Sequence, residues 1–412
     1  MGDLLIHDAK ALVGTHPAGT ALLRGEAMRV LPQVENGWLW AENGRIKAFG
    51  QGTPPAVPQG TPTLNAAGRY LLPGWCDPHT HTVFAAPREG EFVDRINGLD
   101  YQAIAAKGGG ILNSALRLRT LPEEELFQAA RERLAHMMRQ GTVAVEIKSG
   151  YGLDLESELK MLRVVKRLKA ELPLQIKATL LAAHAIPPEY KQNRAGWMKL
   201  ITDTLIPLVA KEGLADFVDC FCETNYFTVQ EMEDILVAGA AHGLPGKVHV
   251  NQFTSIGGVQ AAARQGALSV DHLEVMEPQD LEALSGSSTI PTLLPSCSFF
   301  LRIPYAPARA MLQAGLPVAL ATDLNPGTTP SGNMNLVLSL ACIQLRMLPE
   351  EAFNAATLNA AAAMHLAGEL GSLAPGKRAS FILTEAVPSL AYLPYAFGRP
   401  HIDNVIIDGR IL

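Results

Sequence analysis

Several features that define other classes of protein are missing from this chain of 412 residues. It has only 5 cysteines and no Cys-x-x-Cys pair, so a disulfide-rich exported fold is not indicated and a reduced, cytoplasmic setting fits. No apolar run approaches the roughly 18 residues that a membrane span requires. The N-terminus lacks the basic start and the cleavage site of a signal peptide. The sequence therefore predicts a cytoplasmic protein without a membrane segment.

Positive charge is also scarce. The chain has 34 Lys and Arg against 40 Asp and Glu, a net charge of -6, and no basic cluster that would suit nucleic acid. Hydrophobic residues make up 48% and charged residues 18%, as in ordinary folded proteins. The expected partner is a small molecule, and the length favours one large domain with a smaller one.

Apolar strand patterns alternate with amphipathic helix patterns through the middle of the chain. After the apolar run that leads from Leu71 to His79, strands are expected at 142–148, 175–183, 217–222, 247–252, 268–272, 290–296 and 317–323. Helices are expected at 122–140, at 155–170, and from a capping box at Thr228 to Gly243. Eight strands that alternate with helices predict a (β/α)8 TIM barrel, with a doubly wound open sheet as the alternative.

The two ends of the chain carry short strand patterns that are too few for a core of their own. These strands are expected at 27–30, 37–41, 45–49 and 63–64, and again within 373–383 and 405–410. We expect residues 1–70 and 370–412 to form one small β-sandwich-like domain, next to a barrel that spans 71–369.

Residues of the kind that bind metals recur at the expected strand ends. His79 and His81 follow the first strand, His249 lies in the fifth, and Asp323 ends the eighth. Residues i and i+2 of an extended chain point the same way, and TIM barrels build their active sites at these ends. Three imidazoles and one carboxylate suit a single Zn²⁺ or non-haem iron with a position left for water. Lys148, at the end of the second strand, is badly placed to bridge two ions.

The chemistry of such a site assigns roles to the neighbouring side chains. A metal-bound water ionises near neutral pH and supplies a hydroxide nucleophile. Asp323 can touch the metal and accept a proton, and His272 can stabilise an oxyanion or move the proton. Asp271 is the candidate to orient His272. His184 follows the third strand and is either a further site residue or the cap of a loop.

The metal-ligand pattern resembles the amidohydrolase superfamily, and local motifs resemble its imidazolonepropionase family. These motifs are Asp77–Phe84, Arg88–Phe92, Gly108–Ile111, Lys148–Leu153, Ala183–Pro187, Asp271–Glu274 and Thr322–Gly327. The resemblance implies hydrolysis of 4-imidazolone-5-propanoate to N-formimidoyl-L-glutamate in histidine degradation. It also implies a homodimer that holds one divalent or trivalent metal ion, zinc or iron, in each subunit.

That substrate has a cyclic amide and an anionic propionate tail. Arg88 offers a planar guanidinium to the carboxylate, and the alternative for this side chain is a surface ion pair with Glu89 or Glu91. Tyr151 offers a hydroxyl and a ring face, and His184 offers a hydrogen-bond donor. Three residues just beyond Asp323 are expected to hydrogen-bond the glutamate-like end of the product: Asn325, Gly327 and Thr328.

Gln252 bears on the alternatives within the superfamily. Some members of the family carry Glu here, and the related purine and pyrimidine deaminases use a Glu three residues after the fifth-strand His as a proton shuttle. Gln cannot take a proton, so we expect Gln252 to orient substrate or water while His272 or Asp323 carries the proton. A deaminase and a non-catalytic barrel with a closed, structural metal site are the competing hypotheses.

Overall fold

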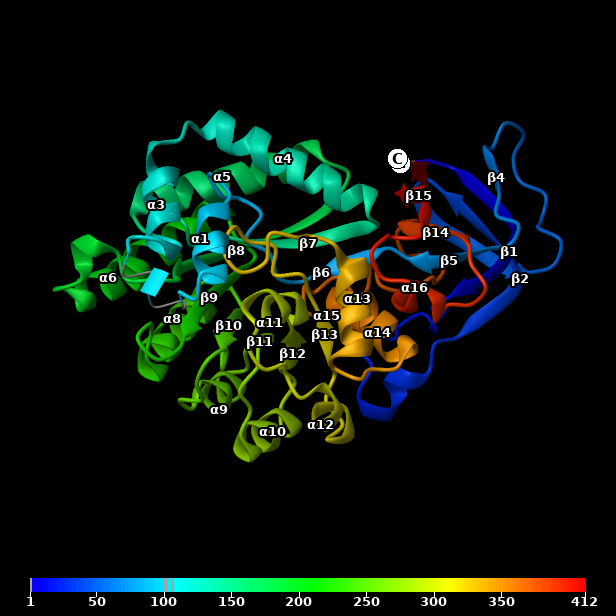
Figure 1. The fold of residues 1–412 in the computed structure, drawn as a ribbon. Coiled ribbons are helices and arrows are strands. Elements are labelled where there is room, and N and C mark those ends of the chain that lie inside the picture. The colour runs from blue at the N-terminus through cyan, green and yellow to red at the C-terminus, as the bar shows by residue number, and fades with distance from the viewer. Residues whose placement is uncertain (1, 100–102, 105–106) are drawn as a thin grey trace.

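The computed structural model describes residues 2–99, 103–104 and 107–412. Two eight-stranded sheets organise the described residues. A parallel sheet surrounded by helices lies to the left in Figure 1, and a mixed sheet lies to the right. Among the described residues, no helix is long and apolar enough to cross a membrane.

The parallel sheet is the predicted barrel. Its strands lie side by side in chain order: β6 (Trp75–Asp77), β7 (Thr142–Lys148), β8 (Gln175–Ala183), β9 (Phe217–Cys222), β10 (Gly246–Val250), β11 (Ser269–His272), β12 (Ile290–Leu293) and β13 (Ala319–Leu320). Beyond the two outer strands the chain closes the ring, because the His81 N–H donates to the Leu324 carbonyl at 2.8 Å and the Asp323 N–H donates to the His79 carbonyl at 3.1 Å. An open doubly wound sheet is therefore excluded.

Helices cover the outside of the barrel. The principal ones are α4 (Glu123–Arg139), α5 (Leu155–Glu171), α8 (Val229–Ala241), α9 (Gly258–Arg264), α10 (Pro278–Ser285), α12 (Ala308–Gln313), α13 (Met334–Ile343) and α14 (Pro349–Ala356). Four apolar positions on one face of α4 are all buried: Leu126, Ala130, Leu134 and Met138. The capping box at the start of α8 forms as predicted between Thr228 and Glu231.

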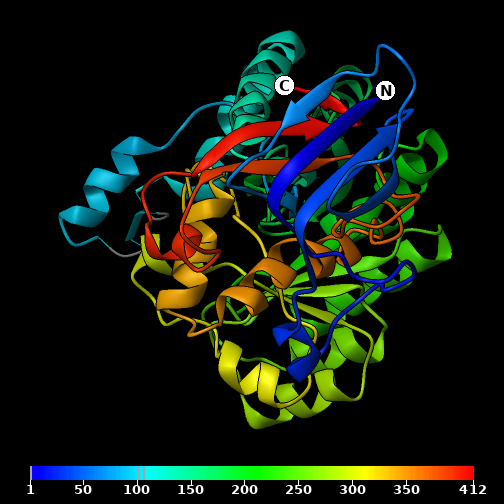
Figure 2. The ribbon, with the colours of Figure 1, turned by 90° about the vertical axis from the view of Figure 1, so that its right-hand side faces the viewer.

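Smaller helices fill the connections between these elements. They are α1 (Glu89–Ile96), α3 (Gly110–Thr120), α6 (Arg194–Leu200), α7 (Ile206–Glu212), α11 (Pro295–Leu301), α15 (Leu358–Ala362) and α16 (Tyr392–Tyr395). In Figure 2, α1 stands away from the body of the molecule. None of its eight residues is buried.

The second sheet joins the two ends of the chain, as predicted. Its order is β16 (Arg410–Ile411), β15 (Ile402–Ile407), β14 (Phe381–Ala386), β5 (Arg69–Pro73), β1 (Leu4–Val13), β2 (Gln33–Glu42) and β3 (Arg45–Gln51), with β4 (Thr63–Asn65) beside β1. Figure 2 shows the blue N-terminal and red C-terminal strands side by side. Buried residues from both ends, such as Ile6 and Phe381, make up one core. The domain boundaries at 70 and 370 stay a prediction.

The apolar run that begins at Leu71 is not one barrel strand, and this prediction was wrong. Leu71 and Leu72 lie in β5 and pair with β14 of the terminal sheet. The barrel strand β6 begins only at Trp75, after Pro73 and Gly74. The two sheets thus share one short stretch of chain, and His79 and His81 lie in the loop that follows it.

Four other predicted strands differ from the structure. Residues 27–30 belong mainly to a 3-10 helix, η1 (Gly25–Arg29). Ser296 lies in α11 because Pro295 occupies the first turn of that helix, where its missing N–H costs nothing. The strand expected at 317–323 is only Ala319–Leu320, and strand structure within 373–383 begins only at Phe381.

Candidate active site

Four of the predicted ligand residues meet at the carboxyl ends of the barrel strands. His249 Nε2 lies 3.3 Å from His81 Nε2, and Asp323 Oδ1 lies 3.5 Å from His79 Nε2 and 3.8 Å from His81 Nε2. Ligand atoms about 2.1 Å from one tetrahedral ion lie about 3.4 Å from each other. The spacing of His79, His81 and Asp323 therefore fits a single metal ion, and His249 lies next to them, in a second such group with His79 and His272.

Two buried carboxylates lie beside the histidine rings. His79 Nδ1 lies 2.7 Å from Asp271 Oδ2, and His249 Nδ1 lies 2.9 Å from Asp219 Oδ2. A proton on Nδ1 that faces a carboxylate leaves the Nε2 lone pair for a metal. Asp271 was expected to orient His272 and instead orients His79.

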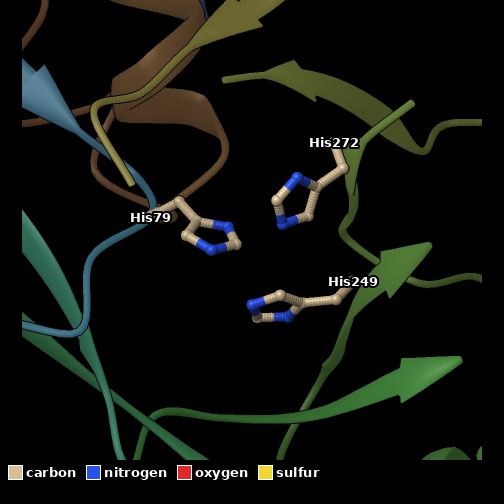
Figure 3. A group of neighbouring side chains, drawn as sticks. All are labelled: His79, His249 and His272. Carbon is tan, nitrogen blue, oxygen red and sulfur yellow. The ribbon is translucent and has the colours of Figure 1, made fainter. Parts of the chain in front are cut away.

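The site passes a simple chemical test for a metal ion. His79 Nε2 is buried and has no hydrogen-bond partner among the described residues. Figure 3 shows that the rings of His79, His249 and His272 face a common centre. A buried nitrogen without a partner is costly, and a cation bound at this centre would satisfy it.

Burial keeps the nearest rings in the neutral form that binds metals. Desolvation, helped by the positive charge of Lys148, holds the pKa of His79 well below its usual range. Desolvation and His184 do the same for the pKa of His81. Desolvation and His249 lower the pKa of His184 to about 3. These side chains therefore present lone pairs and neutral donors at neutral pH.

His272 has a different environment. Its Nδ1 lies 3.4 Å from Glu274 Oε1, so Glu274 is its acidic neighbour. Burial opposes a charge on the ring, but Glu274 and then Asp323 and Asp271 outweigh burial and raise the pKa of His272. His272 has φ 87° and Asp323 has φ 56°, left-handed conformations that are costly outside glycine. Such strain is typical of functional side chains, and ligand atoms of the two residues lie within 4.8 Å of each other.

The predicted substrate-binding residues line one pocket over the histidines. The pocket is lined by Arg88, Tyr151, His184, Gln252, Asn325 and Thr328, together with three of the predicted metal ligands, His81, His249 and Asp323. Arg88 is buried, with Nε 3.3 Å from Glu91 Oε2 and Nη1 donating to Ser114 Oγ at 3.3 Å. The ion pair with Glu91 exists, but it lies inside the pocket wall rather than on the surface.

Gly327 lies against the Arg88 side chain instead of lining the pocket. A Cβ atom at position 327 would lie 1.3 Å from Arg88 Nη2, so the absence of a side chain is what allows the guanidinium to lie there. Asn325 shapes the same loop. The Nδ2 amide group of Asn325 donates to the Asp323 backbone carbonyl and to Thr328 Oγ1, each at 2.7 Å. Its Oδ1 atom accepts the Gly327 and Thr328 N–H groups at 2.8 and 2.7 Å. This uses all the hydrogen-bonding capacity of Asn325, so its side chain builds the loop.

Two side chains that the sequence analysis did not single out support the pocket. Glu158, buried in α5, accepts the N–H groups of Gly150, Gly152 and Leu153 at 3.0, 2.8 and 2.9 Å and thereby holds the loop that carries Tyr151. The same loop reaches His184, whose Nδ1 lies 3.0 Å from the Gly150 carbonyl.

On the opposite side, the buried Cys297 accepts a hydrogen bond at 3.3 Å from Gln252 Nε2 and sets the direction of that amide. Glu158 lies in a helix, away from the strand ends where a sequence search for site residues looks, whereas Cys297 directly follows the strand expected at 290–296 and was not singled out. The helix pattern around Glu158 gives one signal, because it places an acidic residue on the buried face of α5.

Comparisons with known proteins agree with this geometry. The model of the amidohydrolase family matches residues 85–412. An imidazolonepropionase of Christiangramia forsetii is 52% identical over 99% of this chain and 100% of its own. The imidazolonepropionase of Geobacillus thermodenitrificans is 41% identical over 100% of this chain and 98% of its own.

The chain belongs to the imidazolonepropionase family of amidohydrolases.

Solved structures with the same fold lie further away. A guanine deaminase of E. coli has a TM-score of 0.75 at 15% identity and covers 100% of this chain and 99% of its own. An adenosine deaminase of Xanthomonas campestris with bound zinc has a TM-score of 0.71 at 17% identity. At such identity these deaminases share only the fold with the imidazolonepropionase family.

Proposed function

We propose that this protein hydrolyses the cyclic amide C–N bond of 4-imidazolone-5-propanoate and releases N-formimidoyl-L-glutamate. The observation that carries the proposal is the 52% identity, over 99% of the chain, to a protein named as an imidazolonepropionase. The buried cation of Arg88 next to a cluster of histidines supports it, because this substrate joins an anionic tail to an amide ring.

The proposed metal site consists of His79, His81, His249 and Asp323 and takes one divalent or trivalent ion, zinc or iron, per subunit. When bound, such an ion polarises a carbonyl and lowers the pKa of a water molecule to about 7. The family and the cluster of His and Asp side chains support a metal centre of this kind.

The protein's own residues divide the remaining work. Arg88 binds the propionate with two parallel N–H donors, and Tyr151 and His184 contact the ring and its carbonyl. Gln252, held by Cys297, orients substrate or water. His272 and Asp323 hold and move the proton that passes from water to the departing ring nitrogen.

Asn325, Gly327 and Thr328 complete the proposed substrate site. Asn325 acts by building the loop rather than through its side chain, which its own loop occupies. Gly327 makes room for the guanidinium, and Thr328 lines the pocket.

The proposed setting is the cytoplasm and the proposed assembly is a homodimer. All 5 cysteines are free, as expected in a reducing compartment. Light scattering on the purified protein measures the assembly, and a mass equal to one chain would refute the dimer.

The decisive experiment follows the loss of imidazolone ultraviolet absorbance with purified protein. We expect turnover that a chelator abolishes and that added zinc or iron restores, with elemental analysis to identify the resident metal. A panel of purines and pyrimidines, assayed for ammonia, tests the deaminase alternative. Ammonia from a base without loss of imidazolone would overturn the proposal in favour of a deaminase.

A further inference from the structure

A buried group of charged side chains lies inside the barrel beneath the site, and Asp219 and Asp271 connect it to the histidines. It consists of Glu146 and Lys148 on β7, Asp219 on β9, Lys247 on β10 and Asp271 on β11. Their relative exposures lie between 0% and 1%, and none of them lines the pocket. Burial of this much charge is expensive, so a function is expected to accompany it.

Lys148 is the centre of this group. Its Nζ lies 2.6 Å from Glu146 Oε1, 2.8 Å from Asp219 Oδ2 and 3.5 Å from Asp271 Oδ2. The Oδ2 atoms of these two aspartates are the same atoms that face the Nδ1 atoms of His249 and His79. One ammonium group therefore contacts both carboxylates that orient the two histidines.

We propose that Lys148 is a positioning residue, which sets the directions of His79 and His249 toward the metal by fixing Asp219 and Asp271 beneath them. This inference rests on the proposed metal site and not on the identity of the substrate. It also gives a role to the lysine that ends the second strand and does not bridge two ions.

The electrostatics of a dry site explain why a cation is needed. Two carboxylates that share a buried space repel each other strongly, because charge interactions increase as the effective dielectric falls. A lysine between them cancels this repulsion and removes their freedom to turn away. Each carboxylate then keeps one ring nitrogen aimed at the common centre.

Lys247 provides a matched control. It is as fully buried as Lys148 and pairs with the same Glu146. Its other hydrogen bonds go to the backbone carbonyls of Pro78 at 2.8 Å and Ala363 at 3.2 Å. Removing its charge therefore tests the general effect of an uncharged side chain in the buried group.

The test compares Lys148→Met with Lys247→Met in the full chain. Zn²⁺ is titrated into metal-free protein in competition with a chromophoric chelator, and Co²⁺ is added separately to record the visible spectrum of the site. We expect Lys148→Met to weaken Zn²⁺ binding about 10- to 100-fold and to alter the Co²⁺ spectrum. Lys247→Met should bind Zn²⁺ within about threefold of the wild type, because the polar contacts of Lys247 are with Glu146, Pro78 and Ala363 and not with the carboxylates beside the histidines.

Wild-type-like Zn²⁺ binding by Lys148→Met, or an equal loss in both variants, would overturn the inference. If either Met variant fails to fold, Lys148→Gln and Lys247→Gln provide the same comparison with better hydrogen bonding. A wild-type protein that binds neither zinc nor iron would overturn the metal site and this inference together. A wild-type protein that binds Zn²⁺ but leaves imidazolone intact would refute only the proposed substrate.

Discussion

Gly327→Ala gives the sharpest test of the proposed substrate contact. The added Cβ would lie 1.3 Å from Arg88 Nη2, whereas non-bonded carbon atoms ordinarily stay about 3.5 Å or more apart. The guanidinium must therefore move by roughly 2 Å. Since Arg88 presents the end of a flexible side chain, this movement requires little rearrangement of the backbone.

The expected magnitude follows from the contact that is lost. A hydrogen bond to a charged group contributes about 1.5–3 kcal/mol, and each 1.4 kcal/mol is about a tenfold change in affinity. We therefore expect Gly327→Ala to raise KM about 10- to 150-fold. Because the contact is with the tail of the substrate and not with the reacting amide, kcat should change much less.

The assay is steady-state kinetics on imidazolone, with thermal unfolding to check the fold. Gly90→Ala is the matched control, because it makes the same change two residues from Arg88 and its Cβ would meet nothing within 4 Å. The double variant of Gly327→Ala and Arg88→Ala should have the KM of Arg88→Ala alone. An unchanged KM in Gly327→Ala, or additive effects in the double variant, would refute the reasoning.

Three further predictions use the same kinetic and unfolding measurements. Arg88→Ala should raise KM far more than His272→Ala does, while His272→Ala should mainly lower kcat; equal effects on both parameters in both variants would contradict the proposed division of work. Glu158→Gln turns an amide toward backbone N–H donors and should lower the free energy of unfolding, measured in urea, by about 1–3 kcal/mol. A variant as stable as the wild type would count against the supporting role of Glu158. Burial lowers the pKa of Lys377 to about 8, below its value in the unfolded chain. Between pH 8 and about 10 the unfolded chain therefore binds one more proton, and the stability of the wild type should rise with pH relative to that of Lys377→Met. Parallel pH curves for the two proteins would exclude this titration.

The metal-type residues were predictable because each belongs to a local pattern. His79 and His81 share a face through their i, i+2 spacing, and His249 and Asp323 stand at the ends of apolar strands. Closure of the barrel then brings all four together. The partners of the rings were not predictable in the same way. Asp271 lies next to His272 in the chain, yet it faces His79, 192 residues away, because adjacent strand positions point to opposite sides.

The missed strands also have physical causes. In β1 the register shifts between Ile6 and Ala9, and Asp8 has φ 59°, so a bulge interrupts the alternation that marks a strand. Leu71 and Leu72 were placed in the barrel because an apolar pair shows burial but not the sheet that provides it. The local sequence pattern shows that a strand is buried, but the strands with which it pairs are determined by the fold of the whole chain.

The projecting helix α1 puts the proposed substrate-binding Arg88 on a different element from the proposed metal ligands. Arg88 stands at its N-terminal end, while none of the helical residues is buried in the body of the protein. The four proposed metal ligands, by contrast, lie in β10 or in the segments that follow β6 and β13 and close the ring. The proposed anchor for the anionic tail is thus built on an element outside the barrel, separate from the groups proposed to break the bond.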